Sequence, residues 1–242
     1  MSRYVATDWH GQLELAKQIL EYLKPEDKLY FLGDAIDRGP HGLEIMDILL
    51  TDKRVIYLKG NHEDIMYDCL TDMIDGHFDG ITHWVNNGGK SCFTALQYAP
   101  TERVMKYLSA IKRMPERIDL ENEKGQRIIL THAGISPWYS EEDMRLMGRK
   151  YAYIWDRKHL HDYHGHFDKE EYKDTYVIHG HTPVEYLKSP WGCDTTTEEK
   201  ETIAIYAYGH KIDLDLASFV TGRAALFDLD TFEVIYFETG VK

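Results

Sequence analysis

The chain has 242 residues, of which 43% are hydrophobic and 29% charged, a balance typical of globular proteins rather than disordered or fibrous ones. Its 28 basic and 41 acidic side chains give a formal net charge of −13, which argues against a surface that coats nucleic acid and against an electrostatic membrane anchor. The longest apolar clusters, such as residues 48–50 and 224–227, are far shorter than the ~18 residues needed to span a bilayer. An anionic substrate would therefore need a local positive charge, which bound divalent metal ions can supply.

The cysteines indicate a reducing compartment. Cys69, Cys92 and Cys193 are odd in number and widely separated, and no signal-peptide pattern follows Met1. These features are typical of reduced thiols in a cytoplasmic protein.

Three units of strand, polar loop and helix open the chain. Short β-rich runs begin the units, at residues 3–7 (RYVAT), 28–32 (KLYFL) and 54–58 (RVIYL). Apolar residues at helical spacing follow each loop, in residues 12–24, in a helix that begins near Gly42, and in residues 65–73. This alternation predicts an α/β sheet with crossover helices.

The rest of the chain mixes an accessory helical layer with further strands. Residues 76–116 read as that layer, and strand signals return at residues 127–131 and 175–180. Three β-rich runs near the end suggest a second, largely antiparallel sheet: residues 201–208, 223–229 and 233–239. No Pro/Ser-rich linker interrupts the sequence, so residues 1–242 are predicted to form a single domain. Residues 159–171 and 189–201 are predicted loops without a diagnostic motif.

Polar side chains that bind metals follow five of the predicted strands. In chain order they are Asp8 and His10, Asp34 and Asp37, Asn61 and His62, His132, and His181. Ligands of α/β sheets bind outside the carboxyl ends of the strands, so we expect these groups to converge on one crevice. A set of imidazoles, carboxylates and an amide oxygen without thiolate suits Mn, Fe or Zn ions.

The set is larger than one ion needs. An aspartate shared by two ions about 3.5–4 Å apart is the usual arrangement of a two-metal hydrolytic site, in which a water held between the ions attacks as hydroxide. The spacing alone leaves open whether Asp34 or Asp37 is the shared carboxylate. No cysteine-based phosphatase motif and no GxxxxGK[ST] motif is present, which disfavours a thiolate nucleophile and a P-loop.

Five ordered motifs carry a resemblance to a known family. They are DWHG (8–11), GDAIDRG (33–39), GNHE (60–63), THAG (131–134) and HGHT (179–182). They resemble the motifs of the calcineurin-like metallophosphoesterases, and more narrowly the PPP serine/threonine protein phosphatases of the compact bacterial and phage-type branch. HWVNNGG (83–89) and IWDR (154–157) are similar to segments of the same branch. The resemblance implies an αββα sandwich of two mixed β-sheets flanked by helices.

The resemblance also implies a role for each motif residue. The implied metal ligands are Asp8 and His10 for the first ion, Asp34 as the bridge, and Asn61, His132 and His181 for the second. His62 would protonate the leaving group, and Asp37 would orient the His62 ring. Arg38 would hold the phosphoryl oxygens with its planar guanidinium, helped by Arg157 and by Asn61.

Some of these residues have competing interpretations. His179 lies two residues before His181 and is interpreted as structural, because the GHT pattern favours His181 as the ligand. Arg38 could instead pair with an acidic neighbour, and Arg157 rests on one short motif. The histidines at 159, 161, 164 and 166 resemble a metal-binding tract, but their acidic surroundings favour a solvated loop.

The favoured function is hydrolysis of phosphoserine and phosphothreonine in proteins by a metal-dependent phosphatase with two divalent ions, Mn before Fe or Zn. The alternative is a hydrolase of dinucleotide polyphosphates of the diadenosine tetraphosphate type, because such enzymes share the motifs. A non-catalytic phosphate-binding module is disfavoured because no implied ligand is missing, and a nucleic-acid phosphodiesterase because Arg38 is present. The chain departs from the phage-type Asp-Thr-Gly turn at residues 212–219 (IDLDLASF), which leaves open how the loop near His210 borders the site.

Overall fold

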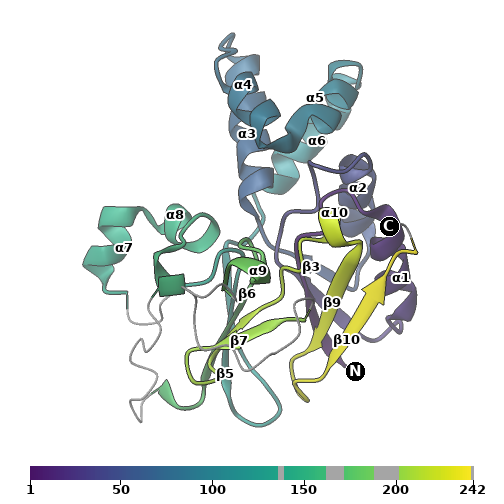
Figure 1. The fold of residues 1–242 in the computed structure, drawn as a ribbon. Coiled ribbons are helices and arrows are strands. Elements are labelled where there is room, and N and C mark those ends of the chain that lie inside the picture. Colours follow the sequence, from purple (N-terminus) through teal and green to yellow (C-terminus); the bar gives the residue numbers. More distant parts are fainter. Residues whose placement is uncertain (136–138, 162–171, 188–201, 241–242) are drawn as a thin grey trace.

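The computed structural model describes residues 1–135, 139–161, 172–187 and 202–240. Two mixed five-stranded sheets lie against each other with helices outside them (Figure 1). The first sheet has the order β10 (Val234–Glu238), β9 (Arg223–Asp228), β1 (Arg3–Ala6), β2 (Lys28–Phe31) and β3 (Val55–Tyr57). The second has the order β4 (Arg117–Glu121), β5 (Arg127–Thr131), β6 (Thr175–His179), β8 (Lys211–Asp213) and β7 (Ala204–Tyr206). The αββα class implied by the motifs is confirmed.

Two groups of helices extend from the sheets. Beside the first sheet lie α1 (Leu13–Tyr22) and α2 (Gly42–Thr51). A helical protrusion rises above both sheets in Figure 1 and comprises α3 (Asn61–Ile74), α4 (Gly80–Trp84), a π-helical turn (Val85–Gly89), α5 (Lys90–Gln97) and α6 (Thr101–Ile111). The remaining helical elements are α7 (Glu141–Met147), α8 (Arg149–Ile154), a 3₁₀ turn (Lys158–His161), α9 (Val184–Leu187) and α10 (Ser218–Thr221). Among the described helices, none has the length and apolar character needed to cross a membrane.

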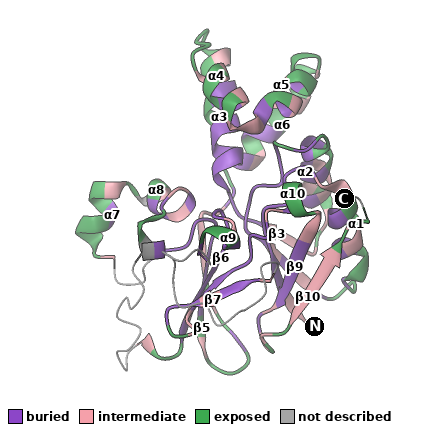
Figure 2. Ribbon diagram, in the orientation of Figure 1, coloured by how far each residue is buried: buried purple, intermediate pink, exposed green. Residues whose placement is uncertain are grey.

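Strand β1 shows how the sequence builds the core on both faces of the first sheet. Tyr4 and Ala6 pack into the cluster shared with helices α1 and α2, whereas Val5 joins the cluster between the two sheets. This alternation follows from the period of two along a strand, and it requires apolar residues at every position of a strand covered on both faces. Figure 2 shows β9 as buried and its neighbour β10, at the edge of the sheet, as intermediate.

The C-terminal strands differ from the sequence-based expectation of a separate antiparallel sheet. β9 pairs antiparallel with β1, joining Val5 to Phe227, and β10 pairs with β9. Only β7 belongs to the second sheet, where it pairs with the short strand β8. The pattern of a strand shows which faces are buried, but its partner is chosen by residues far away in sequence. The expectation of a second sheet built from these three runs is therefore wrong.

Other sequence-based expectations fall on residues whose side chains the structure does not describe. They include Cys193, most of the predicted loops 159–171 and 189–201, and the side chains of the histidine tract.

Asp230 joins the two sheets at the end of the molecule where β9 turns into β10. Its carboxylate accepts hydrogen bonds from the Arg3 guanidinium and, at 2.9 Å, from the backbone N–H of Glu123, which precedes β5. The bond from Arg3 holds the pKa of Asp230 below its ordinary value. The native state therefore favours the ionised carboxylate.

We expect Asp230→Asn to lower the free energy of unfolding by about 1 kcal/mol at neutral pH, since water screens part of this charged pair. The contribution is present above the unfolded-state pKa, near 4, and is lost as the pH falls through the lower folded-state pKa. Urea unfolding of wild type and variant should show the two curves approaching each other as the solution is acidified. In a double-mutant cycle, Arg3→Gln should cause a similar loss and the double variant little more. Equal differences at all pH values would contradict this account.

Candidate active site

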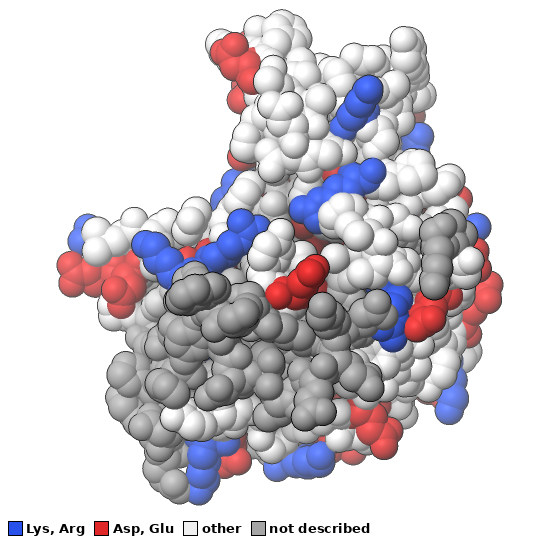
Figure 3. All heavy atoms as spheres, viewed as in Figure 1, with Lys and Arg blue, Asp and Glu red and all other residues white. Residues whose placement is uncertain are grey.

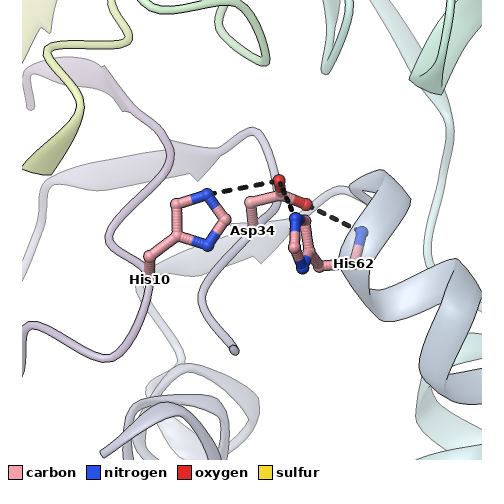
Figure 4. A group of neighbouring side chains, drawn as sticks. All are labelled: His10, Asp34 and His62. Atoms are coloured by element: carbon pink, nitrogen blue, oxygen red, sulfur yellow. Dashed lines mark hydrogen bonds and ion pairs between the residues drawn. The ribbon is translucent and has the colours of Figure 1, made fainter. Parts of the chain in front are cut away.

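The carboxyl ends of β1, β2, β3, β5 and β6 bring the motif residues together above the two sheets. Asp34, which follows β2, lies at the centre of the group. Its Oδ2 atom is 3.5 Å from Nε2 of His10, 3.4 Å from Nε2 of His132 and 3.8 Å from Nε2 of His62. Figure 4 shows His10 and His62 on either side of this carboxylate. The convergence expected from the strand ends is present, although the ends belong to two sheets instead of one.

One group of candidate ligand atoms comes from the loop after β1 together with Asp34. Nε2 of His10 lies 3.8 Å from Oδ1 of Asp8, and both atoms are buried without a hydrogen-bond partner among the described residues. The other ring nitrogen of His10 is held by the Ile36 carbonyl at 2.9 Å, so Nε2 points at the two carboxylates. Buried polar atoms are normally satisfied. This group fits a cation that would satisfy them.

A second group combines Asn61, His132, His181 and the same aspartate. Oδ1 of Asn61 lies 2.9 Å from Nε2 of His132 and 2.9 Å from Nδ1 of His181. The Leu32 carbonyl, 3.0 Å from Nδ1 of His132, fixes that ring with Nε2 directed inward. Asp34 is thus placed between two groups of nitrogen and oxygen atoms, which suit Mn, Fe or Zn.

The electrostatics of the site favour a cation at its centre. Burial holds the pKa of His10 and of His181 well below the ordinary value, so these rings are neutral, the form that binds metals. Burial also disfavours protonated His132, but the charge and hydrogen bond of Asp34 outweigh it and raise the His132 pKa to about 9, so a cation bound at this ring would displace its proton. Burial opposes ionisation of Asp34, yet the charges of His132 and His62 hold its pKa well below the usual range.

His62 lies beside Asp34, and Asp37 binds the ring nitrogen of His62 that faces away from Asp34. Its Nδ1 atom donates to Oδ2 of Asp37 at 2.8 Å, and Nη2 of Arg38 lies 3.3 Å from its Nε2 atom. Burial disfavours the imidazolium, but the charges of Asp34 and Asp37 and the hydrogen bond to Asp37 together raise the His62 pKa. The spacing of the sequence left the roles of Asp34 and Asp37 open, and the structure puts Asp34 between the ligand groups and Asp37 behind His62.

Trp84 extends this arrangement, and sequence reasoning did not assign it a role. Its indole N–H donates to Oδ2 of Asp37 at 2.9 Å. In the π-helical turn that follows, the Gly88 carbonyl accepts from the backbone N–H of Arg38 at 2.9 Å. A Cβ atom on Gly89 would lie 2.2 Å from the Trp84 ring, so this packing requires glycine there. The HWVNNGG motif therefore positions both Asp37 and Arg38.

Unusual backbone conformations gather at the site. Positive φ angles occur at Asp8 (56°), His10 (40°), Asp34 (60°), Asp37 (66°), Arg38 (60°) and His181 (70°). Such angles are uncommon outside glycine and cluster where function requires them. Close packing accompanies them, since a Cβ atom on Gly180 would lie 2.1 Å from Oδ2 of Asp8.

Glu63, the last residue of the GNHE motif, stabilises the loop after β2 and was also missed. Its buried carboxylate accepts from the backbone N–H groups of Asp34 (2.8 Å), Ala35 (3.0 Å) and Gly60 (3.0 Å), and from the Tyr57 hydroxyl (2.7 Å). The interaction ties the loop that carries Asp34 to the start of α3.

We expect Glu63→Ala to lower the free energy of unfolding by at least about 3 kcal/mol, because each of three buried N–H groups left without an acceptor costs about 1–3 kcal/mol. Glu63→Gln retains one acceptor oxygen and should lose less. Chemical denaturation of the metal-free protein measures both variants. A loss for Glu63→Ala no larger than that of a surface substitution would contradict this role.

The two candidate phosphate-binding arginines differ in their surroundings. Arg38 lies with its Cζ atom 4.6 Å from the ring centre of Phe219, in α10, and Phe219 in turn contacts the His10 ring. Arg157 donates from Nε to the Thr182 hydroxyl at 3.1 Å and is exposed. Figure 3 shows basic side chains near the junction of the helical protrusion and the sheets, despite the net charge of −13.

Two further expectations concern His179 and the cysteines. His179 is buried and contacts the Tyr206 hydroxyl through Nε2 at 2.7 Å, so its ring is engaged away from Asp34. Cys69 and Cys92 are buried free thiols, and burial raises the pKa of each. Neither is in a setting that favours a thiolate.

The sequence is similar to one protein family and to proteins of two named kinds. The model of the family described as calcineurin-like phosphoesterase matches residues 1–213. A bis(5'-nucleosyl)-tetraphosphatase of Anoxybacillus flavithermus is 25% identical over 168 residues, covering 65% of this chain and 64% of that protein. A Caenorhabditis elegans protein provisionally named a serine/threonine-protein phosphatase is 39% identical over 66 residues, covering 24% of this chain and 18% of that protein. The matches thus span less than two thirds of either relative.

Among solved structures, a crystal structure provisionally described as a diadenosine tetraphosphatase superposes with a TM-score of 0.59 at 15% sequence identity. The superposition covers 99% of this chain and 94% of the other. At this identity the likeness concerns the fold.

Proposed function

This chain belongs to the calcineurin-like phosphoesterase family, and from that membership we propose that it hydrolyses phosphate esters or anhydrides with two divalent metal ions. The observation that carries the proposal is the convergence of buried ligand atoms on Asp34, several of which have no partner among the described residues. Such atoms are rare in folded proteins unless a ligand satisfies them.

Each ion has its own set of side chains in this proposal. Asp8 and His10 hold the first, Asn61, His132 and His181 hold the second, and Asp34 bridges. Bound divalent ions lower the pKa of water and neutralise charge on phosphoryl oxygens. The nitrogen and oxygen donors without thiolate suit Mn, Fe or Zn, and of these we take Mn as the first choice.

The remaining residues bind the phosphoryl group and move a proton. His62 stands close to Asp34 with its Nδ1 proton held by Asp37, which leaves Nε2 directed toward the site. We assign to His62 the donation of a proton to the leaving oxygen. Arg38 is adjacent to Nε2 of His62, and we assign its guanidinium to the phosphoryl oxygens. Arg157, which donates to the Thr182 hydroxyl next to His181, is assigned to the same task.

The favoured substrate class is a dinucleotide polyphosphate. It is supported by the long alignments with bis(5'-nucleosyl)-tetraphosphatases and by aromatic side chains near the ligands. The Trp155 ring lies 6.5 Å from the His181 ring and lines a groove of about 450 Å³ together with Tyr151. An aromatic ring there can stack on a nucleobase.

The second candidate is the phosphoprotein substrate favoured by the sequence. Its support is the lining of the same groove, which includes Asp64, Asp68 and Asp72 at helical spacing along α3. Acidic side chains of this kind favour a peptide with basic residues next to the phosphorylated one.

A hydrolysis panel separates the two candidates. With Mn present, diadenosine tetraphosphate should give a kcat/KM at least about tenfold above those of phosphoserine, phosphothreonine and phosphotyrosine peptides. The reason is that one base stacked on an aromatic side chain strengthens binding by about that order of magnitude. Trp155→Ala should then raise KM for the dinucleotide but not for p-nitrophenyl phosphate, and Tyr98→Ala, a control on an exposed distant side chain, should change neither. Preference for a basic phosphopeptide would instead establish the second candidate.

A further inference from the structure

Strand pairing brings Asp215 to the same edge of the second sheet as His181. Strand β8 runs parallel to β6, and His179 is paired with Asp213. His181 and Asp215 each come two residues after this pair. The backbone N–H of Leu214 also donates to the His179 carbonyl at 2.9 Å, which continues the alignment beyond the strands. Asp215 therefore lies beside the loop that carries a candidate metal ligand, at a position that the sequence analysis noted only as a departure from the family's turn.

The Asp215 side chain is buried and only half satisfied. It is 1% exposed, and Oδ1 accepts from the backbone N–H of Ala217 at 2.8 Å. Among the described residues, Oδ2 has no hydrogen-bond partner. Asp8 lies at the same edge, because its Oδ2 atom accepts a hydrogen bond from the backbone N–H of His181 at 3.1 Å.

Three of the buried polar atoms without a hydrogen-bond partner belong to Asp215 and to the proposed ligands of the first ion. Oδ1 of Asp8, Nε2 of His10 and Oδ2 of Asp215 are all buried without a partner among the described residues. Asp8 and Asp215 are both buried carboxyl groups at this edge, and buried carboxylates that face each other repel unless a cation lies between them. Carboxylate oxygens and a neutral imidazole nitrogen are ligands that Mn accepts.

We propose that Asp215 is a further ligand of the metal ion that Asp8 and His10 bind, an inference that rests on the two-metal function proposed above. The first ion then has three carboxylates, from Asp8, Asp34 and Asp215, whereas the second shares only Asp34. The extra negative charge makes the first site the tighter one and favours a hard divalent cation there.

Metal titration of the full chain tests this assignment. The metal-free wild type, Asp215→Asn and Asp27→Asn are titrated with Mn²⁺ and the bound ions followed by calorimetry and electron paramagnetic resonance. Asp27 is a matched control, since it is also buried and accepts two backbone hydrogen bonds, but at the opposite end of β1 and β2. We expect Asp215→Asn to weaken one of two Mn sites by at least about 10–100-fold, the loss typical even of groups that only support a ligand. Asp27→Asn should match the wild type.

Thermal unfolding separates a ligand from a structural residue. Without metal, Asp215→Asn should unfold at the same or a higher temperature than the wild type, because the change removes a buried charge. With Mn²⁺ added, the wild type should gain more than the variant. Unchanged Mn affinity at both sites, or a metal-free variant that fails to fold, overturns the assignment and leaves the two-metal function standing. A wild-type chain that binds no Mn²⁺ overturns both.

Discussion

Asp34→Asn is expected to remove both metal ions and to abolish hydrolysis. The Asp34 carboxylate lies between the two groups of ligand atoms and is the only residue assigned to both. An asparagine keeps the size of the side chain but offers one oxygen without the negative charge. Metal analysis should find about two ions per wild-type chain and close to none in the variant, with loss of activity on every phosphoester tested.

Asn61→Ala is the matched comparison for this prediction. Oδ1 of Asn61 contacts only His132 and His181 among the ligand side chains, so its loss should empty the second site and leave the first occupied. If Asp34→Asn retained two ions, Asp34 would not be the bridge. If Asn61→Ala lost both, the two sites would not be separable in the way we describe.

His62→Asn is expected to lower kcat by about 10²–10⁴-fold on phosphoserine peptides while leaving the metal content intact, since general acid catalysis contributes about that much. The alkoxide released from phosphoserine is a poor leaving group and needs the proton. The structure holds Nδ1 of His62 on Asp37, and Nε2 is the nitrogen available for transfer. Asp37→Asn should cause a smaller loss of the same kind.

The size of the loss should depend on the leaving group. The p-nitrophenolate ion leaves without protonation, so His62→Asn should be much less harmful on p-nitrophenyl phosphate. An equal loss on both substrates would mean that His62 does not act as an acid. A loss of metal from the variant would make it a ligand, a role its distance of 3.8 Å from Asp34 allows.

The sequence predicted those parts of the fold that depend on local pattern. The strands that became β1, β2, β3, β5 and β6 and the helices after the first three are present where the apolar spacing placed them. The sheet assignment of β9 and β10 failed because pairing joins Val5 to Phe227 across most of the chain. Strands β4 and β8 were not predicted. The alternation of charged and apolar residues in β4 is a strand signal that the sequence analysis missed, whereas β8 is only three residues long.

The site likewise contains residues that a local pattern predicts and residues that only long-range contacts bring together. The motif residues could be predicted from the sequence because each follows a strand. Glu63, Trp84, Phe219 and Asp215 were within quoted segments but had no role assigned. Their roles come from contacts between segments that are distant in sequence, such as Trp84 with Asp37, and no local spacing encodes them.

The position of β1 between β2 and β9 has a consequence for synthesis of the chain. One edge of β1 pairs with β2 soon after both are made, but the other must wait for residues 227–228. At about 5–20 residues per second, the ribosome needs on the order of 10–45 s to reach them. During that interval the nascent protein presents an open strand edge, the feature through which partly made chains aggregate. Cells making this protein would therefore benefit from a chaperone that shields the N-terminal half, and chains cut short before β9 should be insoluble.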